Sequence, residues 1–364
     1  MMKNKQVMIS SIYSSLLPIV LALFVGGIII AVIGENPFLT YQIMIQKSLF
    51  TSQGILKTLH FAAPLILTGL GIAITFKANI FNMGVEGAAV LGAFFAGVVG
   101  FSLKGIHPAF HITLCLITGM LTGMIVTFIP AILKAYFKVN EMVVTLMLNY
   151  IVVEIVKLLA QGVYKDPASG YVSTYAIADS AMFKKIFNSD LTLFFFIALI
   201  VLIIFYVIFT KSKLGFEITA MGKNPEFAEA TGMNVAQKII IIMLISGAVS
   251  GLAGAGFLMS EKYRFTLDFF GNPGLGWDGM LVALLANHSP MGVLVVSVFY
   301  AALKNGSEYI GLFTNVPKDI VGVIQGILIL FLSVRFVSQN TSLSKKVKSL
   351  FSKNAVENGK SNWQ

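Results

Sequence analysis

The chain has 364 residues, of which 57% are hydrophobic and only 12% are charged. Soluble domains carry about 25% charged residues, and one soluble core of this length could not hide so much apolar surface without aggregating. The composition therefore excludes an ordinary soluble protein. It favours an all-α integral membrane protein, in which lipid surrounds the apolar residues.

The net charge of +10 would fit a protein that binds nucleic acid. The lysines, however, lie at the chain ends and in short loops between apolar runs, and this distribution is typical of topological bias toward the cytoplasm. We therefore expect contact with membrane lipid and no nucleic-acid partner. Residues 341–364, in which five lysines face one acid, are predicted to form a basic cytoplasmic tail beside anionic lipid.

About ten apolar segments predict a transmembrane domain over residues 1–340. A membrane-spanning helix needs about 20 mostly apolar residues, and the short eighth and ninth segments predict short or broken helices. We expect the first segment to be retained, because it lacks a small-x-small cleavage site. The segments lie near 14–33, 58–76, 83–101, 109–133, 142–160, 191–210, 238–260, 274–287, 290–303 and 319–337.

The charged loops predict the orientation of these segments. Four lysines place the segment 211–238 in the cytoplasm, and the long polar loop 161–190 then falls outside the cell. Counting the segments in both directions places both termini in the cytoplasm. The single cysteine, Cys115, excludes an intrachain disulfide and a metal or redox site built on cysteine.

Two short motifs suggest an internal repeat. Gly84-Val85-Glu86-Gly87 opens the third segment, and Gly276-Trp277-Asp278-Gly279 opens the eighth. The eighth segment is five spans after the third, and an odd difference means opposite orientation, so we expect two inverted five-helix repeats. Each acid has two interpretations that the sequence leaves open. Glu86 and Asp278 either interact with the positive end of a helix in its first turn or form polar parts of a translocation path.

Several polar residues carry local predictions. Asn82 is either the N-cap of the third helix or a residue of the path. Asn149, in the middle of the fifth segment, is expected to bond another helix rather than a ligand, and Glu154 should pair with Lys157. Small residues at four-residue spacing predict close helix packing, and they are Gly84, Ala88, Gly92, Ala96 and Gly100, with Gly119, Gly123, Gly247, Gly251, Ala255, Gly322 and Gly326 in other segments.

The cytoplasmic loop 211–238 is predicted to contain a two-turn helix over 225–231. Asn224 suits the N-cap, Pro225 the first helical position, Glu226 the positive end and Gly232 the position after the C-cap. So short a helix is unstable alone and must pack on something. It is suited to transmitting force from a soluble partner. The chain has no Gly-x4-Gly-Lys-Ser/Thr phosphate loop, so energy must come from an ion gradient or another subunit.

Four blocks of sequence resemble one transporter family. They are Asn79 to Gly87, Asn140-Glu141 with Thr145 to Tyr150, Gly215 to Gly232, and Trp277 to Met280 with Val282 to Leu285. Over residues 60 to 335 the chain is similar to the ABC permeases of nucleosides and simple sugars, a branch of the superfamily that includes branched-chain amino acid and ribose permeases.

The resemblance implies a transport subunit that is not itself an enzyme and binds no cofactor. ATP and Mg²⁺ would be bound by a partner ATPase subunit. A second permease subunit, the same or homologous, and an extracytoplasmic solute-binding lipoprotein would complete an importer in the cell membrane. Coupling to the ATPase would fall on Gly215, Glu217, Gly222, Asn224, Pro225, Glu226, Ala230 and Gly232.

We expect the substrate path to use aromatic faces and amides, because these suit a nucleobase and a ribose. The candidates are Phe81, Asn82, Glu86, Asn149, Trp277 and Asp278. Two alternatives are an ion-coupled transporter working alone, with the two acids as its ion site, and an ABC permease for branched-chain amino acids. A membrane enzyme with a metal on His107 and His111 has little support, because no third ligand lies nearby in the sequence.

Overall fold

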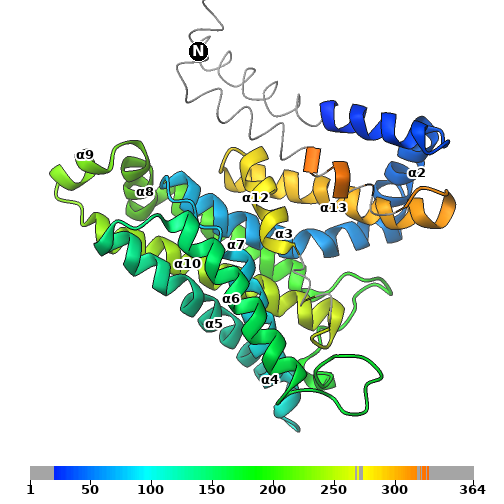
Figure 1. The fold of residues 1–364 in the computed structure, drawn as a ribbon, viewed down its shortest axis with the longest axis horizontal. Coiled ribbons are helices and arrows are strands. Elements are labelled where there is room, and N and C mark those ends of the chain that lie inside the picture. The colour runs from blue at the N-terminus through cyan, green and yellow to red at the C-terminus, as the bar shows by residue number, and fades with distance from the viewer. Residues whose placement is uncertain are drawn as a thin grey trace, which may run out of the picture. The chain divides into compact units, whose positions relative to one another are not determined.

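The structure is a computed structural model that describes residues 20–266, 269, 274–317, 320, 322–324 and 326–327. These described residues are mainly α-helical (Figure 1) and contain isolated β-bridges but no strand. The prediction of an all-α protein is therefore confirmed for this part of the chain. The predicted tail, 341–364, lies outside the described residues, as does most of the predicted segment 319–337.

The chain divides into two compact units. The first combines Met1–Tyr41 with Ile310–Gln364, and the second is Gln42–Tyr309. In the first unit a helix over Val20–Val32 is followed by the start of α2 (Pro37–Leu49), whose residues from Gln42 on belong to the second unit, and the two helices are bent by 119°. The Tyr41 hydroxyl donates to the Leu23 carbonyl across this bend at 2.7 Å.

The second unit contains the remaining helices. They are α3 (Ser52–Lys77), α4 (Val85–Ser102), α5 (Pro108–Phe137), α6 (Glu141–Gln161), η1 (Asp179–Ala181), α7 (Leu193–Lys211), α8 (Lys213–Lys223), α9 (Pro225–Ala230), α10 (Val235–Phe257), the π-helix η2 (Leu258–Lys262), α12 (Leu275–Leu285) and α13 (Pro290–Phe313), whose last residues belong to the first unit. Among the described residues, six helices are long and apolar enough to cross a membrane, or up to seven with the bent pair. The protein is therefore a multi-pass membrane protein.

The helices α2 and α8 were not predicted from the sequence. α2 and α8 mix polar and apolar side chains within 13 and 11 residues, so neither resembles a membrane span. The short helix after Asn224 was predicted over 225–231 and is confirmed over Pro225–Ala230. The predicted ninth segment, 290–303, is too short, because α13 continues to Phe313.

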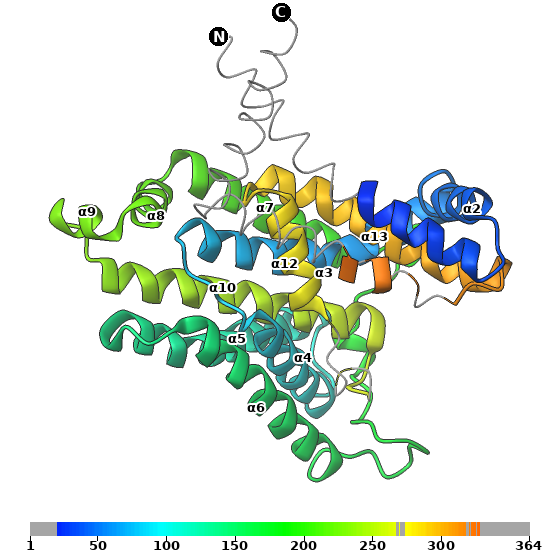
Figure 2. The same cartoon turned by 45° about the horizontal axis from the view of Figure 1, so that its top comes forward.

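The core of the second unit is built on the predicted small residues. α10 packs along α5 and α4 (Figure 2). A Cβ atom placed on Gly92 of α4 would lie 2.6 Å from the Cα atom of Gly251 in α10, and one on Gly119 of α5 would lie 2.6 Å from the Cβ atom of Ala255. Only residues this small allow the helix backbones to approach so closely. The packing prediction is confirmed for α4, α5 and α10, but it is wrong for Gly322 and Gly326, where a Cβ atom would meet nothing within 4 Å among the described residues.

Candidate functional site

The two ends of the second unit carry different elements. α8 and α9 lie at one end, and the loop 162–192 lies at the other (Figures 1 and 2). The contacts agree, because the end of α3 lies at the first end, where the Lys77 ammonium stands 4.4 Å from the centre of the Phe209 ring. At the other end, the Gln53 amide at the start of α3 donates to the Asn188 carbonyl at 3.4 Å.

A non-helical segment, 78–84, joins α3 to α4 inside the bundle. Its buried backbone groups need partners in place of water, and the polar face of α6 supplies them. The Phe81 amide donates to the Glu141 carboxylate at 3.2 Å, and the Met83 amide donates to the Thr145 hydroxyl at 3.1 Å. Glu141 also pairs with Lys134 of α5 at 2.7 Å. This acid in the first turn of α6 therefore holds both the segment 78–84 and the end of α5.

Asn149 continues the same face of α6. Its amide nitrogen donates to the Met83 carbonyl at 2.7 Å, and its amide oxygen accepts from the Gly87 amide at 2.9 Å. The prediction that Asn149 bonds another helix is confirmed. The pair Glu154–Lys157, further along α6, is confirmed as well at 3.5 Å.

Asn82 is fully buried and joins the start of α4 to α10. Its side-chain oxygen accepts from the Gly84 amide at 2.9 Å, and its nitrogen donates to the Ser246 hydroxyl at 3.0 Å. The N-cap position of α4 belongs to Gly84. The interpretation of Asn82 as the N-cap is therefore wrong by two residues. The bond from the Gly84 amide to the Asn82 side chain forms a turn before the helix begins.

Glu86 brings the two motifs of the suggested repeat into contact. It lies in the first turn of α4, is 2% exposed, and its carboxylate accepts from the Gly274 amide at 3.0 Å and from the Gly276 amide at the start of α12. The positive ends of two helices thus meet at one negative charge, which offsets both. A Cβ atom on Gly276 would lie 2.6 Å from the Glu86 nitrogen, so glycine is what allows this approach.

Asp278 has a different environment from Glu86, although the motifs match. Its carboxylate accepts from the Tyr300 hydroxyl and lies 3.4 Å from the Lys304 ammonium, both on α13. Trp277 beside it is partly exposed. Sequence reasoning missed Tyr300 and Lys304, although their spacing from one another, one helical turn, would have placed them on one face of a helix.

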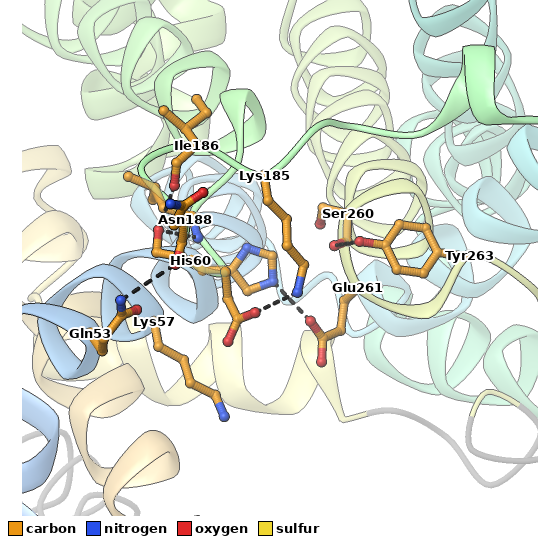
Figure 3. A network of polar contacts seen from close by, with 12 residues as sticks. Gln53, Lys57, His60, Lys185, Ile186, Asn188, Ser260, Glu261 and Tyr263 are labelled. Atoms are coloured by element: carbon orange, nitrogen blue, oxygen red, sulfur yellow. Dashed lines mark hydrogen bonds and ion pairs between the residues drawn. The ribbon is translucent and has the colours of Figure 1, made fainter.

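A polar network closes the end that carries the loop 162–192 (Figure 3). His60 of α3 contacts the Glu261 carboxylate in η2 at 3.1 Å, and Lys185 pairs with Asp190 at 2.6 Å. The Lys185 hydrogen bond holds the pKa of the Asp190 carboxyl below its usual value. The first contact joins α3 to η2 and the second lies within the loop, while the Gln53–Asn188 bond fastens the loop to the start of α3.

The same loop also runs along the segment that leaves η2. The Ile177 amide donates to the Tyr263 carbonyl at 2.9 Å, and the Phe183 amide donates to the Met259 carbonyl at 3.1 Å. His111, one of the two histidines weighed as metal ligands, lies 2.8 Å from the Ser180 hydroxyl of this loop. Its ring therefore has a structural partner.

The predicted punctuation of α9 is confirmed. The Asn224 side chain accepts from the Phe227 amide at 2.9 Å, Pro225 is the first helical residue, and Glu226 lies in the first turn. Gly232 follows the C-cap with φ +86°, and its amide donates to the Glu229 carbonyl at 2.9 Å. Glycine adopts this left-handed conformation at little cost.

The glycines of α8 allow close packing. A Cβ atom on Gly215 would collide with the Ile208 carbonyl of α7, and one on Gly222 would collide with the Lys77 carbonyl at the end of α3. Gly222 thus places α8 against the point where the chain enters the segment 78–84. Glu217 lies inside this arrangement, 6% exposed, with the Lys238 ammonium at 2.6 Å.

The outer face of α8 and α9 carries two exposed aromatic side chains among polar and charged residues. Phe216 and Phe227 are 68% and 64% exposed, and Asn224, Pro225, Glu226, Ala230 and Gly232 are exposed around them. Sequence reasoning missed both phenylalanines. The available signal was an aromatic side chain on each of two short helices that lie next to charged residues.

Comparison with known proteins identifies the family. Residues 54–333 match the family described as "Branched-chain amino acid transport system / permease component". The chain belongs to this family. Residues 54–309 of the second unit and residues 319–333 of the predicted last segment fall inside the matched region. No solved structure matches the chain significantly.

Three relatives are similar over most of their length. The nucleoside ABC transporter permease NupB of Lactococcus lactis is 32% identical, over 88% of this chain and 90% of that protein. The guanosine ABC transporter permease NupP of Bacillus subtilis is 34% identical, over 90% and 96%. A glucose ABC transporter permease of Haloferax volcanii is 30% identical, over 87% and 85%. These relatives are transport subunits rather than enzymes, and this chain is likewise an ABC transporter permease.

Proposed function

We propose that this permease carries nucleosides into the cell, with simple sugars as the second class of substrate. The observation that supports nucleosides is the similarity over most of both chains to a nucleoside permease and a guanosine permease. Sugars are retained because a glucose permease is nearly as similar. Access to the substrate path alternates between the two sides of the membrane, driven by ATP hydrolysis in a partner, and the substrate passes between two permease subunits.

The importer needs partners that supply energy and substrate. An ABC ATPase binds ATP and Mg²⁺, while this chain binds no cofactor. An extracytoplasmic solute-binding lipoprotein delivers the substrate, and a second permease, the same or homologous, completes the path. In this proposal the chain has two inverted five-helix halves, both termini in the cytoplasm, and a basic tail. The contact between the two Gly-x-acid-Gly motifs at Glu86 supports the inverted arrangement.

The six candidate path residues divide into two groups. Asn82, Glu86 and Asn149 are buried, and their bonds hold the start of α4 and α12. In this proposal they hold in place the helix ends that border the substrate path. Phe81, Trp277 and Asp278 are partly exposed, and they face the substrate.

The coupling residues divide in the same way. Gly215, Glu217 and Gly222 hold α8 against α7, Lys238 and the end of α3. Asn224, Pro225, Glu226, Ala230 and Gly232 shape or surround the exposed face of α9. The ATPase docks on this face, and movement of α8 reaches the segment 78–84 through Gly222.

The first experiment is purification of the tagged chain in mild detergent, followed by mass spectrometry of the proteins that accompany it. We expect an ATPase with a phosphate-loop motif and a second permease. The purified complex is then placed in liposomes with its binding protein and tested for ATP-dependent uptake of guanosine and of glucose. A solitary chain that moves solute without ATP would contradict the proposal and favour an ion-coupled transporter.

A further inference from the structure

The exposed surfaces of the helices differ in chemistry. The middle turns of α5, α6 and α7 present mostly apolar side chains, with the phenol of Tyr150 among them, and the aliphatic and thioether ones include Leu121, Ile125, Met147, Ile151, Ile200 and Ile203. This is the surface expected against lipid. α12 and α13 differ, because the Asp278 and Lys304 side chains are 14% and 38% exposed there.

Asp278 lies at mid-depth in the bundle, whereas Lys304 lies nearer the start of α3, because the neighbouring Asn305 bonds the Gly54 carbonyl and the Thr58 hydroxyl. Gly279, the next residue of α12, packs against Thr68, which lies near the middle of the membrane-spanning helix α3. A charged side chain at the bilayer centre costs about 2.5–3.5 kcal/mol on insertion scales. The face that carries these charges therefore borders protein or a watery path rather than lipid.

Among the described residues, the partners of Asp278 leave part of its bonding capacity unused. Tyr300 is fully buried and its hydroxyl fixes one carboxylate oxygen of Asp278. The Lys304 ammonium reaches the other oxygen at 3.4 Å, which is long for such a bond. A carboxylate offers about four acceptor positions and an ammonium three donors. Neighbouring hydroxyl groups, which donate and accept at once, match this set, and the neutral sum of the two charges suits an uncharged solute.

We propose that Asp278 and Lys304, with Tyr300 holding the carboxylate in place, form a subsite that binds the ribose hydroxyls of a nucleoside on the translocation path. This inference rests on the proposed function. Trp277, partly exposed beside Asp278, presents an aromatic ring to the base. Tyr300 acts as a positioning residue and does not touch the substrate.

The test compares uptake of guanosine and 2′-deoxyguanosine by the complete transporter in liposomes. The readout is the ratio of kcat/KM for the two nucleosides, which does not depend on the amount of folded protein. The contribution of the binding protein is common to all permease variants and cancels when their ratios are compared. We expect Asp278→Asn and Lys304→Gln to lower the wild-type preference for guanosine by about tenfold, because the 2′-hydroxyl loses its charged partner.

The control is Lys57→Gln, which removes another lysine–carboxylate pair, with Glu308 at 2.6 Å, and should keep the wild-type ratio. If Asp278→Asn does not assemble, Lys304→Gln decides, since that ammonium is partly exposed and Tyr300 still holds Asp278. Variants that transport both nucleosides at the wild-type ratio would overturn the subsite alone. A wild-type complex that carries neither nucleoside would overturn the proposed function and the subsite with it.

Discussion

At the scale of single residues, buried amide and carboxylate side chains form the hydrogen bonds to backbone groups that a continuous helix would form itself. In the segment 78–84 the amides of residues 78–80 bond back to α3, and Asn149 satisfies both the Met83 carbonyl and the Gly87 amide. Glu86 does the same for the amides that begin α12. These side chains are costly to bury without partners. Each bond therefore stabilises the fold and also fixes the position at which the helical structure is interrupted inside the membrane.

We predict that Asn149→Leu destabilises the protein by about 1–3 kcal/mol, because it leaves two buried backbone groups without partners. An ordinary interhelical hydrogen bond in a membrane is worth only about 0.6 kcal/mol on average. A loss of stability larger than this value would therefore come from the backbone groups left without partners. The measurement is thermal unfolding in detergent. The control is Met147→Leu on the exposed face of α6, and equal unfolding temperatures for the two variants would contradict the prediction.

At the scale of helices, two kinds of contact organise the second unit. α4, α5 and α10 meet through glycines, so their backbones lie too close for larger side chains. α8 and α9 instead expose aromatic side chains that nothing in the described part of this chain covers. The packing of α4, α5 and α10 forms a rigid core. The exposed face of α8 and α9 is suited to a protein partner, because exposed aromatic residues commonly anchor interfaces.

Gly251→Ala is predicted to lower the unfolding temperature by several degrees. Its Cβ atom would collide with the Gly119 carbonyl of α5, and overpacking of this kind costs about 1–3 kcal/mol. The matched control is Gly170→Ala in the loop 162–192, where a Cβ atom meets nothing within 4 Å. A Gly251→Ala protein as stable as this control would show that α5 and α10 can separate without loss.

Phe227→Ala is predicted to weaken ATPase binding and to lower ATP-driven uptake by about tenfold or more, as expected for an aromatic anchor. The amount of ATPase that accompanies the purified permease provides the measurement. Phe110→Ala removes an equally exposed phenylalanine, 63% against 64%, at the start of α5, and should leave ATPase binding unchanged. Equal ATPase recovery with both variants would exclude α9 as the docking element.

At the scale of the whole molecule, orientation follows from which elements share an end. The basic segment with α8 and α9 lies with the end of α3, and the loop 162–192 lies with its start. We predict that a cysteine at Ala168 is labelled by an impermeant thiol reagent in intact cells. A cysteine at Ala230 should be labelled only after the cells are opened. Both positions are exposed, and buried Cys115 sets a low background. The reverse pattern would invert the proposed topology.

The sequence by itself determined the class of protein, the small-residue packing and the end signals of α9, because each depends on composition or on residues a few positions apart. It also placed Asn149 in a helix contact, since an amide in the middle of an apolar run needs a partner. Only the tertiary structure decided which groups are paired. Glu86 bonds α12 from 188 residues away, Glu217 is buried against Lys238, and Asp278 meets Tyr300 and Lys304. Such partners depend on how helices cross, and periodicity within one helix carries no information about the crossing.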